Sequence, residues 1–144
     1  MKFVLDNKEL AEEFFDDTRF LGIVAPIHDF QFCWRLNQVM GMDFRINNDI
    51  EIQLARKNRK YFFSIYEYGE PNGTLVHYLY KNRFDGEFLL PEFQHLDFLW
   101  LMKGDLVADE ILRQHIEGIR SINGVQLVTE LTNEKIKNKT HLVF

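Results

Sequence analysis

Two aromatic segments joined by a short turn are the strongest constraint on the fold of this chain. Residues 60–68, "KYFFSIYEY", and residues 74–80, "TLVHYLY", are rich in aromatic and β-branched side chains, which are enriched in β-strands. The segment between them, "GEPNG" (69–73), contains a proline and an Asn-Gly pair, both typical of tight turns. The pattern predicts two neighbouring antiparallel strands inside a meander.

Four tyrosines on these strands form a candidate interaction surface. Tyr66 and Tyr68 share one face of the first strand, and Tyr78 and Tyr80 share one face of the second, because side chains two positions apart point the same way. A tight turn at 70–73 brings Tyr66 opposite Tyr78. If helices cover this face it belongs to the core; if it is exposed, it has the composition of an interface. The sequence leaves both readings open.

The chain before the meander predicts a strand, a helix and a hairpin. "RFLGIVAP" (19–26) is a short apolar run closed by a proline, as expected of a strand. Residues 29–40 predict a helix with start and stop signals at Asp29 and Gly41. Its regularly spaced apolar residues are Phe32, Leu36, Val39 and Met40. "MDFRINNDIEIQL" (42–54) alternates on both sides of an Asn-Asn-Asp turn, which predicts a hairpin.

Both ends of the chain predict further elements. Residues 2–5 predict a short strand and residues 8–17 a short acidic helix. "DFLWLMKG", "ADEILRQHIEGIR" and "GVQLVTEL" predict strand, helix and strand, a split βαβ unit. In rhythm this segment resembles the ligand-binding ACT module, whose strand–loop–helix corner corresponds here to Lys103, Gly104 and Asp105. "KTHLVF" (139–144) predicts a closing strand.

Residues 91–103 fit two structures. Pro91 at a first helical position and Gly104 beyond the end suit one continuous helix. Five consecutive apolar residues, from Phe98 to Met102, would however surround such a helix on every side. We therefore predict one helical turn at 91–95 and a central strand at 96–103.

Composition bounds the class of protein. The 144 residues, 46% of them hydrophobic, fit a single domain over 1–144 with an ordinary core. A net charge of −5 gives no help to nucleic-acid binding, which needs a clustered basic face. The single cysteine, Cys33, excludes an internal disulfide and a cysteine-rich zinc site. No run reaches membrane-spanning length, so we expect a cytoplasmic protein.

Residues 90–98, "LPEFQHLDF", resemble the signature of the IPExxxVDY family, small bacterial proteins of unassigned function. Pro91, Glu92 and Asp97 match that signature at its spacing, and the other three defined positions differ conservatively. The order of segments is similar as well, from an N-terminal strand and helix through an aromatic meander to a final "LVF". The resemblance implies no reaction, and Phe98 stands where the family has a tyrosine.

The same segment carries the candidate chemistry. Glu92 and Asp97 are a candidate pair of carboxylates for general acid–base work. His95 and Asp97, two apart, would face the same side of a strand as a candidate metal pair. The structural interpretation is stronger: Pro91-Glu92 suit the first turn of a helix, and Asp97 would orient a neighbouring backbone amide. Two ligands do not make a metal site, and we expect none.

The sequence therefore predicts a single α+β domain, with a mostly antiparallel sheet, two main helices and a ferredoxin-like or ACT-like βαβ segment at the C-terminal end. The leading hypothesis for function is a small interaction or scaffold protein without catalytic activity or cofactor. We expect it to self-associate, as a dimer, through a sheet edge or the tyrosines. The alternatives are an ACT-like small-molecule sensor and an enzyme that uses Glu92 and Asp97.

Overall fold

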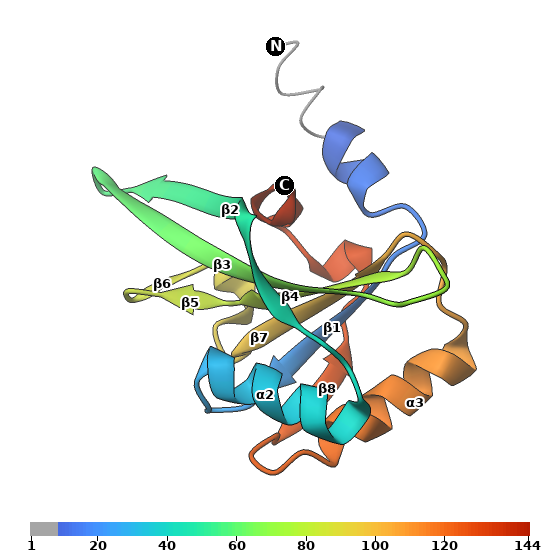
Figure 1. Ribbon diagram of the computed structural model, residues 1–144. Coiled ribbons are helices and arrows are strands. Elements are labelled where there is room, and N and C mark those ends of the chain that lie inside the picture. Colours follow the sequence, from blue (N-terminus) through green and yellow to red (C-terminus); the bar gives the residue numbers. More distant parts are fainter. Residues whose placement is uncertain (1–8) are drawn as a thin grey trace.

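An antiparallel sheet of six strands runs through the middle of the protein (Figure 1). The computed structural model describes residues 9–144, apart from the side chain of Asn133. In spatial order the strands are β2 (Arg45–Arg56), β3 (Arg59–Gly69), β4 (Val76–Lys81), β7 (Phe98–Lys103), β1 (Arg19–Val24) and β8 (Leu127–Glu130). Two short strands, β5 (Arg83–Phe84) and β6 (Glu87–Phe88), pair separately. The predicted α+β class with a mostly antiparallel sheet is confirmed.

The C-terminal third forms the predicted split βαβ unit. Strand β7 leads through helix α3 (Asp109–Arg120) to β8, and β1 pairs antiparallel with both β7 and β8. The two strands joined by the helix are therefore parallel to each other with β1 between them. The predicted helical turn and strand at 91–103 are also confirmed, as the 3₁₀ turn η1 (Pro91–Phe93) followed by β7.

Helices α2 (Asp29–Met40) and α3 cover one face of the sheet (Figure 1). Helix α2 ends at Gly41, whose φ of 66° is left-handed, a conformation that favours glycine. The prediction of a helix over 29–40 is thus confirmed. Phe32 and Leu36 are buried as its periodicity predicts, but Val39 is 55% exposed. The core under these helices includes Leu21, Ile23, Leu79, Phe98, Trp100 and Met102 from the sheet.

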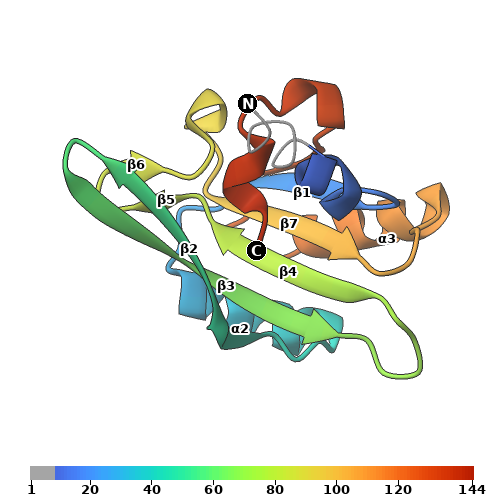
Figure 2. The same ribbon diagram turned by 90° about the horizontal axis from the view of Figure 1, so that it is seen from above.

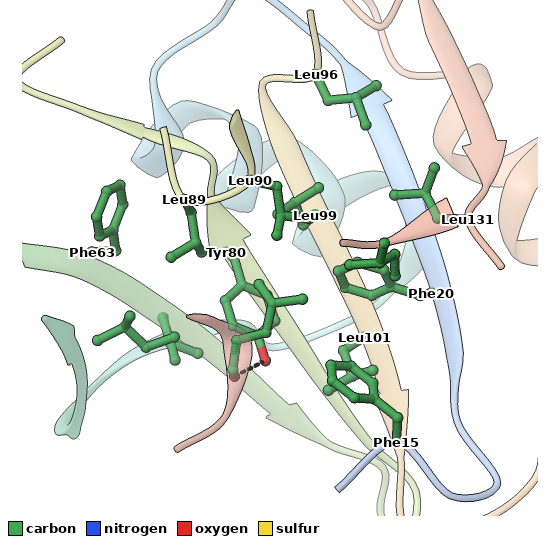
Figure 3. Packing of buried hydrophobic residues seen from close by; sticks show 14 of the residues in the cluster. Phe15, Phe20, Phe63, Tyr80, Leu89, Leu90, Leu96, Leu99, Leu101 and Leu131 are labelled. Carbon is green, nitrogen blue, oxygen red and sulfur yellow. Dashed lines mark hydrogen bonds between the residues drawn. The ribbon is translucent and has the colours of Figure 1, made fainter. Parts of the chain in front are cut away.

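The opposite face is covered by short segments from both ends of the chain (Figure 2). Residues 9–14 are helical, and η1, η2 (Asn133–Lys135) and η3 (Lys139–Leu142) complete this layer. Figure 3 shows its core, in which leucines and phenylalanines surround Tyr80. Because both faces are covered at its centre, strand β7 is buried from two sides, which explains its near-continuous apolar sequence.

The prediction that Tyr66 lies opposite Tyr78 is wrong. Tyr66 pairs with Leu79, and Tyr78 pairs with Glu67. The main-chain amide of Glu70 donates to the carbonyl of Leu75 at 2.9 Å, so the loop comprises residues 71–74. A change of one residue in register moves a side chain to the other face of a sheet.

The four tyrosines therefore lie on two faces and form no common surface. Tyr66 and Tyr68 pack against the core under the helices, whereas Tyr78 and Tyr80 pack against the opposite core. The Tyr66 hydroxyl donates to Asp29 at 2.7 Å, and the Tyr80 hydroxyl donates to the carbonyl of Leu142 at 2.9 Å. Burial raises the pKa of Tyr78 to about 12. These contacts make the tyrosines part of the core rather than an interface.

Two further predictions are wrong, and one lies outside the described residues. Residues 42–54 form no hairpin, because β2 continues through Asn47–Asp49 as a bulge between Ile46 and Glu51. Residues 139–142 form the 3₁₀ turn η3 rather than a closing strand. The strand predicted at 2–5 lies outside residues 9–144.

Candidate functional site

Glu92 lies in the turn formed by the signature residues 90–98, here called the signature turn. It binds the C-terminal segment at residues 137–138. It lies in the first turn of η1, after Pro91, and its carboxylate accepts hydrogen bonds from the main-chain amides of Lys137 and Asn138 at 2.7 and 2.8 Å. The side-chain amide of Asn138 donates a third, at 2.8 Å. Partial burial raises the pKa of Glu92, but these hydrogen bonds outweigh it, and the pKa is lowered.

Asp97 orients the end of a neighbouring strand. Its carboxylate accepts from the main-chain amide of Ala25 at 2.8 Å, and its own amide donates to the carbonyl of Ile23, also at 2.8 Å. Glu92 and Asp97 thus hold different segments of backbone, and His95 between them is exposed. The arrangement matches the structural interpretation of the signature.

The centre of this region is a residue that the sequence interpretation missed. Asn82 is fully buried and its side-chain amide donates to the carbonyls of Phe93 and Leu96, each at 2.9 Å. Its side-chain oxygen accepts from the amide of Leu90 at 2.9 Å. One asparagine therefore satisfies three backbone groups of the signature turn. Asn82 follows β4 directly in "YKNRF", a position with no distinctive motif.

The Lys103–Asp105 corner makes contacts within the chain. The Lys103 ammonium donates to the carbonyl of Phe14 and lies 4.4 Å from the centre of its ring. Gly104 has a φ of 106°, and a Cβ built there would lie 2.1 Å from the carbonyl oxygen of Thr74. Phe14 and Thr74 therefore occupy the space next to Lys103 and Gly104, while Asp105 is exposed.

A polar cluster that the sequence interpretation missed lies under α3. Glu70, His77 and His115 are the one group of three in residues 9–144 whose ligand atoms could meet at a metal ion, all within 4.8 Å of one another. His77 is 0% exposed. Its Nδ1 atom lies 3.0 Å from the Trp100 indole nitrogen, and its Nε2 atom lies 2.6 Å from a carboxylate oxygen of Glu70.

Hydrogen bonding fixes the proton of His77 on Nε2. An indole N–H can only donate, so Nδ1 of His77 must accept from Trp100, and Nε2–H donates to Glu70. A metal ion needs an unprotonated nitrogen, and the second nitrogen of a metal-ligating histidine ordinarily donates. Here that nitrogen accepts instead, so the three side chains do not fit a metal ion while the bond from Trp100 persists.

The surroundings keep His77 neutral. Burial lowers the pKa of His77, and His115 acts in the same direction, whereas Glu70 opposes them. Burial likewise lowers the pKa of His115. The His77 ring is stacked on that of Tyr68, at 5.7 Å between centroids. The cluster is a buried polar network in which the bond from Trp100 depends on a neutral His77.

The outer face of α2 is the most unusual surface of the protein. Phe30 is 62% exposed and Trp34 is 65% exposed, and residues four apart lie on the same side of a helix. A helix on a sheet ordinarily presents polar residues to solvent. The buried side of α2 already carries Phe32, Cys33 and Leu36, so Phe30 and Trp34 are additional to what packing requires.

A hollow with two cationic side chains adjoins the start of α2. It has a volume of about 420 Å³, and its lining includes Pro26, His28, Lys81 and Arg83 together with one acidic residue, Asp97. Within residues 9–144 neither Lys81 nor Arg83 forms an ion pair. We define Phe30, Trp34, Lys81 and Arg83 as the α2 surface.

The far end of α2 has the opposite charge. A shallow hollow beyond Gly41 is lined by Asp43, Asp49 and Glu67, among others, and contains one cation, Arg45. Arg45 pairs with Asp43 at 3.2 Å, and both side chains are largely exposed. An exposed pair of this kind is weak, so both groups remain available to other charges.

No protein-family model matches this chain, and no curated protein matches it either. The resemblance to the IPExxxVDY signature therefore stays a prediction. In residues 9–144 no helix combines the length and the apolar character needed to cross a membrane.

Proposed function

We propose that this protein is a non-catalytic interaction domain that binds another protein chain through the α2 surface. The observation that carries the proposal is the exposure of Phe30 and Trp34, at 62% and 65%, on one side of α2. Aromatic side chains are enriched in the centres of protein interfaces, and arginine is enriched with them. The adjoining Arg83 and Lys81 give the same surface a polar, charged border.

The contacts of the other candidate sites favour this proposal over a sensor or an enzyme. The carboxylates of Glu92 and Asp97 bind backbone amides of two different segments. A general acid or base needs a carboxyl group that faces a substrate. At the Lys103 corner, contacts with Phe14 and Thr74 occupy the place where an ACT-like ligand would bind.

We also propose a cytoplasmic location and membership of the IPExxxVDY family. Cys33 is the single cysteine of the chain, and it is buried. Burial raises the pKa of its thiol to about 12, so the reactive thiolate is not formed near neutral pH. A chain without cysteine pairs is suited to a reducing compartment.

Native mass spectrometry of the untagged protein, purified gently from its own cells, tests the interaction. We expect complexes with the mass of two or more chains, and we expect Phe30→Ser with Trp34→Ser to abolish them. The matched control is Leu106→Ser with Ile111→Ser, which removes two other exposed apolar side chains and should leave the complexes intact. A wild type found only as the free single chain, bound neither to a second copy nor to another protein, or complexes that survive the α2 variant, would refute the proposal.

A further inference from the structure

We infer that the partner of the α2 surface is a second copy of this chain, with the two α2 helices packed antiparallel about a two-fold axis. The inference rests on the proposed function and names its partner. Closed two-fold dimers are the commonest assemblies of identical chains, and their interface must be complementary to itself. The α2 surface, together with the acidic hollow beyond Gly41, meets this requirement in charge.

The sequence of α2 places Trp34 near the centre of such a pair. Helix α2 runs from Asp29 to Met40, so its midpoint lies between Trp34 and Arg35. In an antiparallel pair centred there, Trp34 of each copy lies beside the axis, and Phe30, in the first turn of the helix, lies near the end. Apolar groups at the centre with charges at the border are the usual anatomy of an interface.

The two ends of α2 are complementary across the same axis. Pro26, in the hollow with Lys81 and Arg83, and Asp43, beyond the far end, are equally distant in sequence from the helix midpoint. The two-fold axis therefore brings Asp43 of one copy to the cationic hollow of the other, twice per dimer. Opposite charges at both ends favour the antiparallel over the parallel arrangement.

The size of the surface indicates a reversible dimer. Phe30 and Trp34 from both copies together offer about 500 Å² of exposed aromatic area. A standard interface buries about 1,600 Å² in total, so the charged ends must contribute much of the remainder. We therefore expect association that depends on salt, because exposed charges are screened.

A nucleic acid is a weaker candidate for this surface. Non-specific binding of nucleic acid neutralises several phosphates with clustered cations, whereas the hollow presents Lys81 and Arg83 in a chain of net charge −5. An acidic peptide from another protein would also satisfy Lys81 and Arg83, but the acidic end of α2 would then have no partner.

Charge reversal tests the antiparallel arrangement. Lys81→Glu alone, or Asp43→Lys alone, places like charges at both ends of the dimer and should raise the Kd about tenfold or more. When the two variants are mixed in equal amounts, one end of the mixed dimer joins the two substituted side chains, whose charges are again opposite, and the other end keeps the native pair. We expect the mixture to regain wild-type association, measured by analytical ultracentrifugation at low salt.

Two matched variants serve as controls. Lys135→Glu and Asp105→Lys make the same changes of charge at exposed positions away from α2, and they should leave the Kd unchanged alone and in mixture. A mixture of the α2 variants that stays as weak as each variant alone would overturn the antiparallel dimer.

The same series separates this inference from the proposed function. If the wild type is monomeric up to high concentration, yet its complexes with another protein are lost on Phe30→Ser with Trp34→Ser, the second copy is refuted and the interaction domain stands. A bound nucleic acid or acidic peptide in those complexes likewise refutes the second copy. If no complex depends on Phe30 and Trp34, both proposals fail.

Discussion

Replacement of His77 by phenylalanine measures what the buried Trp100–His77–Glu70 network contributes to stability. Phenylalanine keeps a ring in the fully buried site, beside Tyr68, but it removes both nitrogen atoms. The indole N–H of Trp100 then has no acceptor in a place without water, which costs about 1–3 kcal/mol. Glu70 is partly exposed, so water can replace His77 as the hydrogen-bond partner of its carboxylate. The loss of this second hydrogen bond therefore costs less stability than the loss of the bond from Trp100.

The expected net loss is about 2 kcal/mol, since the more apolar ring offsets part of the loss. For a chain of this length that corresponds to a melting temperature lower by about 4–8 °C. Urea denaturation followed by far-ultraviolet circular dichroism at pH 8 gives the free energy of unfolding directly. His95→Phe, at an exposed position, is the control and should change it little.

A double-mutant cycle with Trp100→Phe decides whether the hydrogen bond is the cause. In the His77→Phe background the indole N–H is already unpaired. Trp100→Phe should therefore lower the free energy of unfolding by about 1–2 kcal/mol less in that background than in the wild type. Strictly additive losses would refute the reasoning, because they would mean that Trp100 and His77 stabilise the fold independently. A decrease in the free energy of unfolding below about 0.5 kcal/mol for His77→Phe would also refute the reasoning, because substitutions at the surface have effects of that size.

The polar contacts lead to three further expectations. Because the pKa of His77 is lowered from its ordinary value of 6.5, the unfolded chain binds the proton more readily than the folded protein. The free energy of unfolding should therefore fall as the pH drops through 6.5. Urea titrations between pH 8 and pH 5 should show this pH dependence, and His77→Gln should reduce it. Wild-type protein should give no calorimetric heat with Zn²⁺ at this cluster, whereas Trp100→Phe frees His77 to ligate and should bind it; zinc binding to the wild type would contradict the proton assignment. Glu92→Ala removes three hydrogen bonds from the C-terminal segment and should accelerate hydrogen exchange at the amide of Asn138 about tenfold or more, with unchanged exchange counting against the role of Glu92.

The sequence predicted those elements whose signals are local. Helix α2 carries its own stop signal at Gly41, and the strand β7 follows from five consecutive apolar residues that only a sheet covered on both faces can bury. The place of Glu92 in a first helical turn and the bond of Asp97 to a neighbouring backbone amide were also predicted, whereas the bonds of Glu92 to Lys137 and Asn138 were not.

The register of β3 with β4 could not be predicted in the same way. It depends on which residues close the loop, and a change of one position moved Tyr66 and Tyr78 to opposite faces. The Trp100–His77 bond joins two strands whose pairing the sequence does not state, so the cluster had no local signal. The exposure of Phe30 and Trp34 was hidden as well, because α2 has apolar residues on more than one side.

Strand β1 is synthesised early, but the two strands that pair with it are synthesised late. Its neighbours β7 and β8 begin at Phe98 and Leu127, and translation at about 5–20 residues per second needs several seconds to reach them. In that interval β2, β3 and β4 can pair with one another, whereas the apolar segment Arg19–Val24 has no strand to join. The nascent chain therefore offers chaperones a defined target, and substitutions that slow the pairing of β1 should reduce the yield of folded protein more than its final stability.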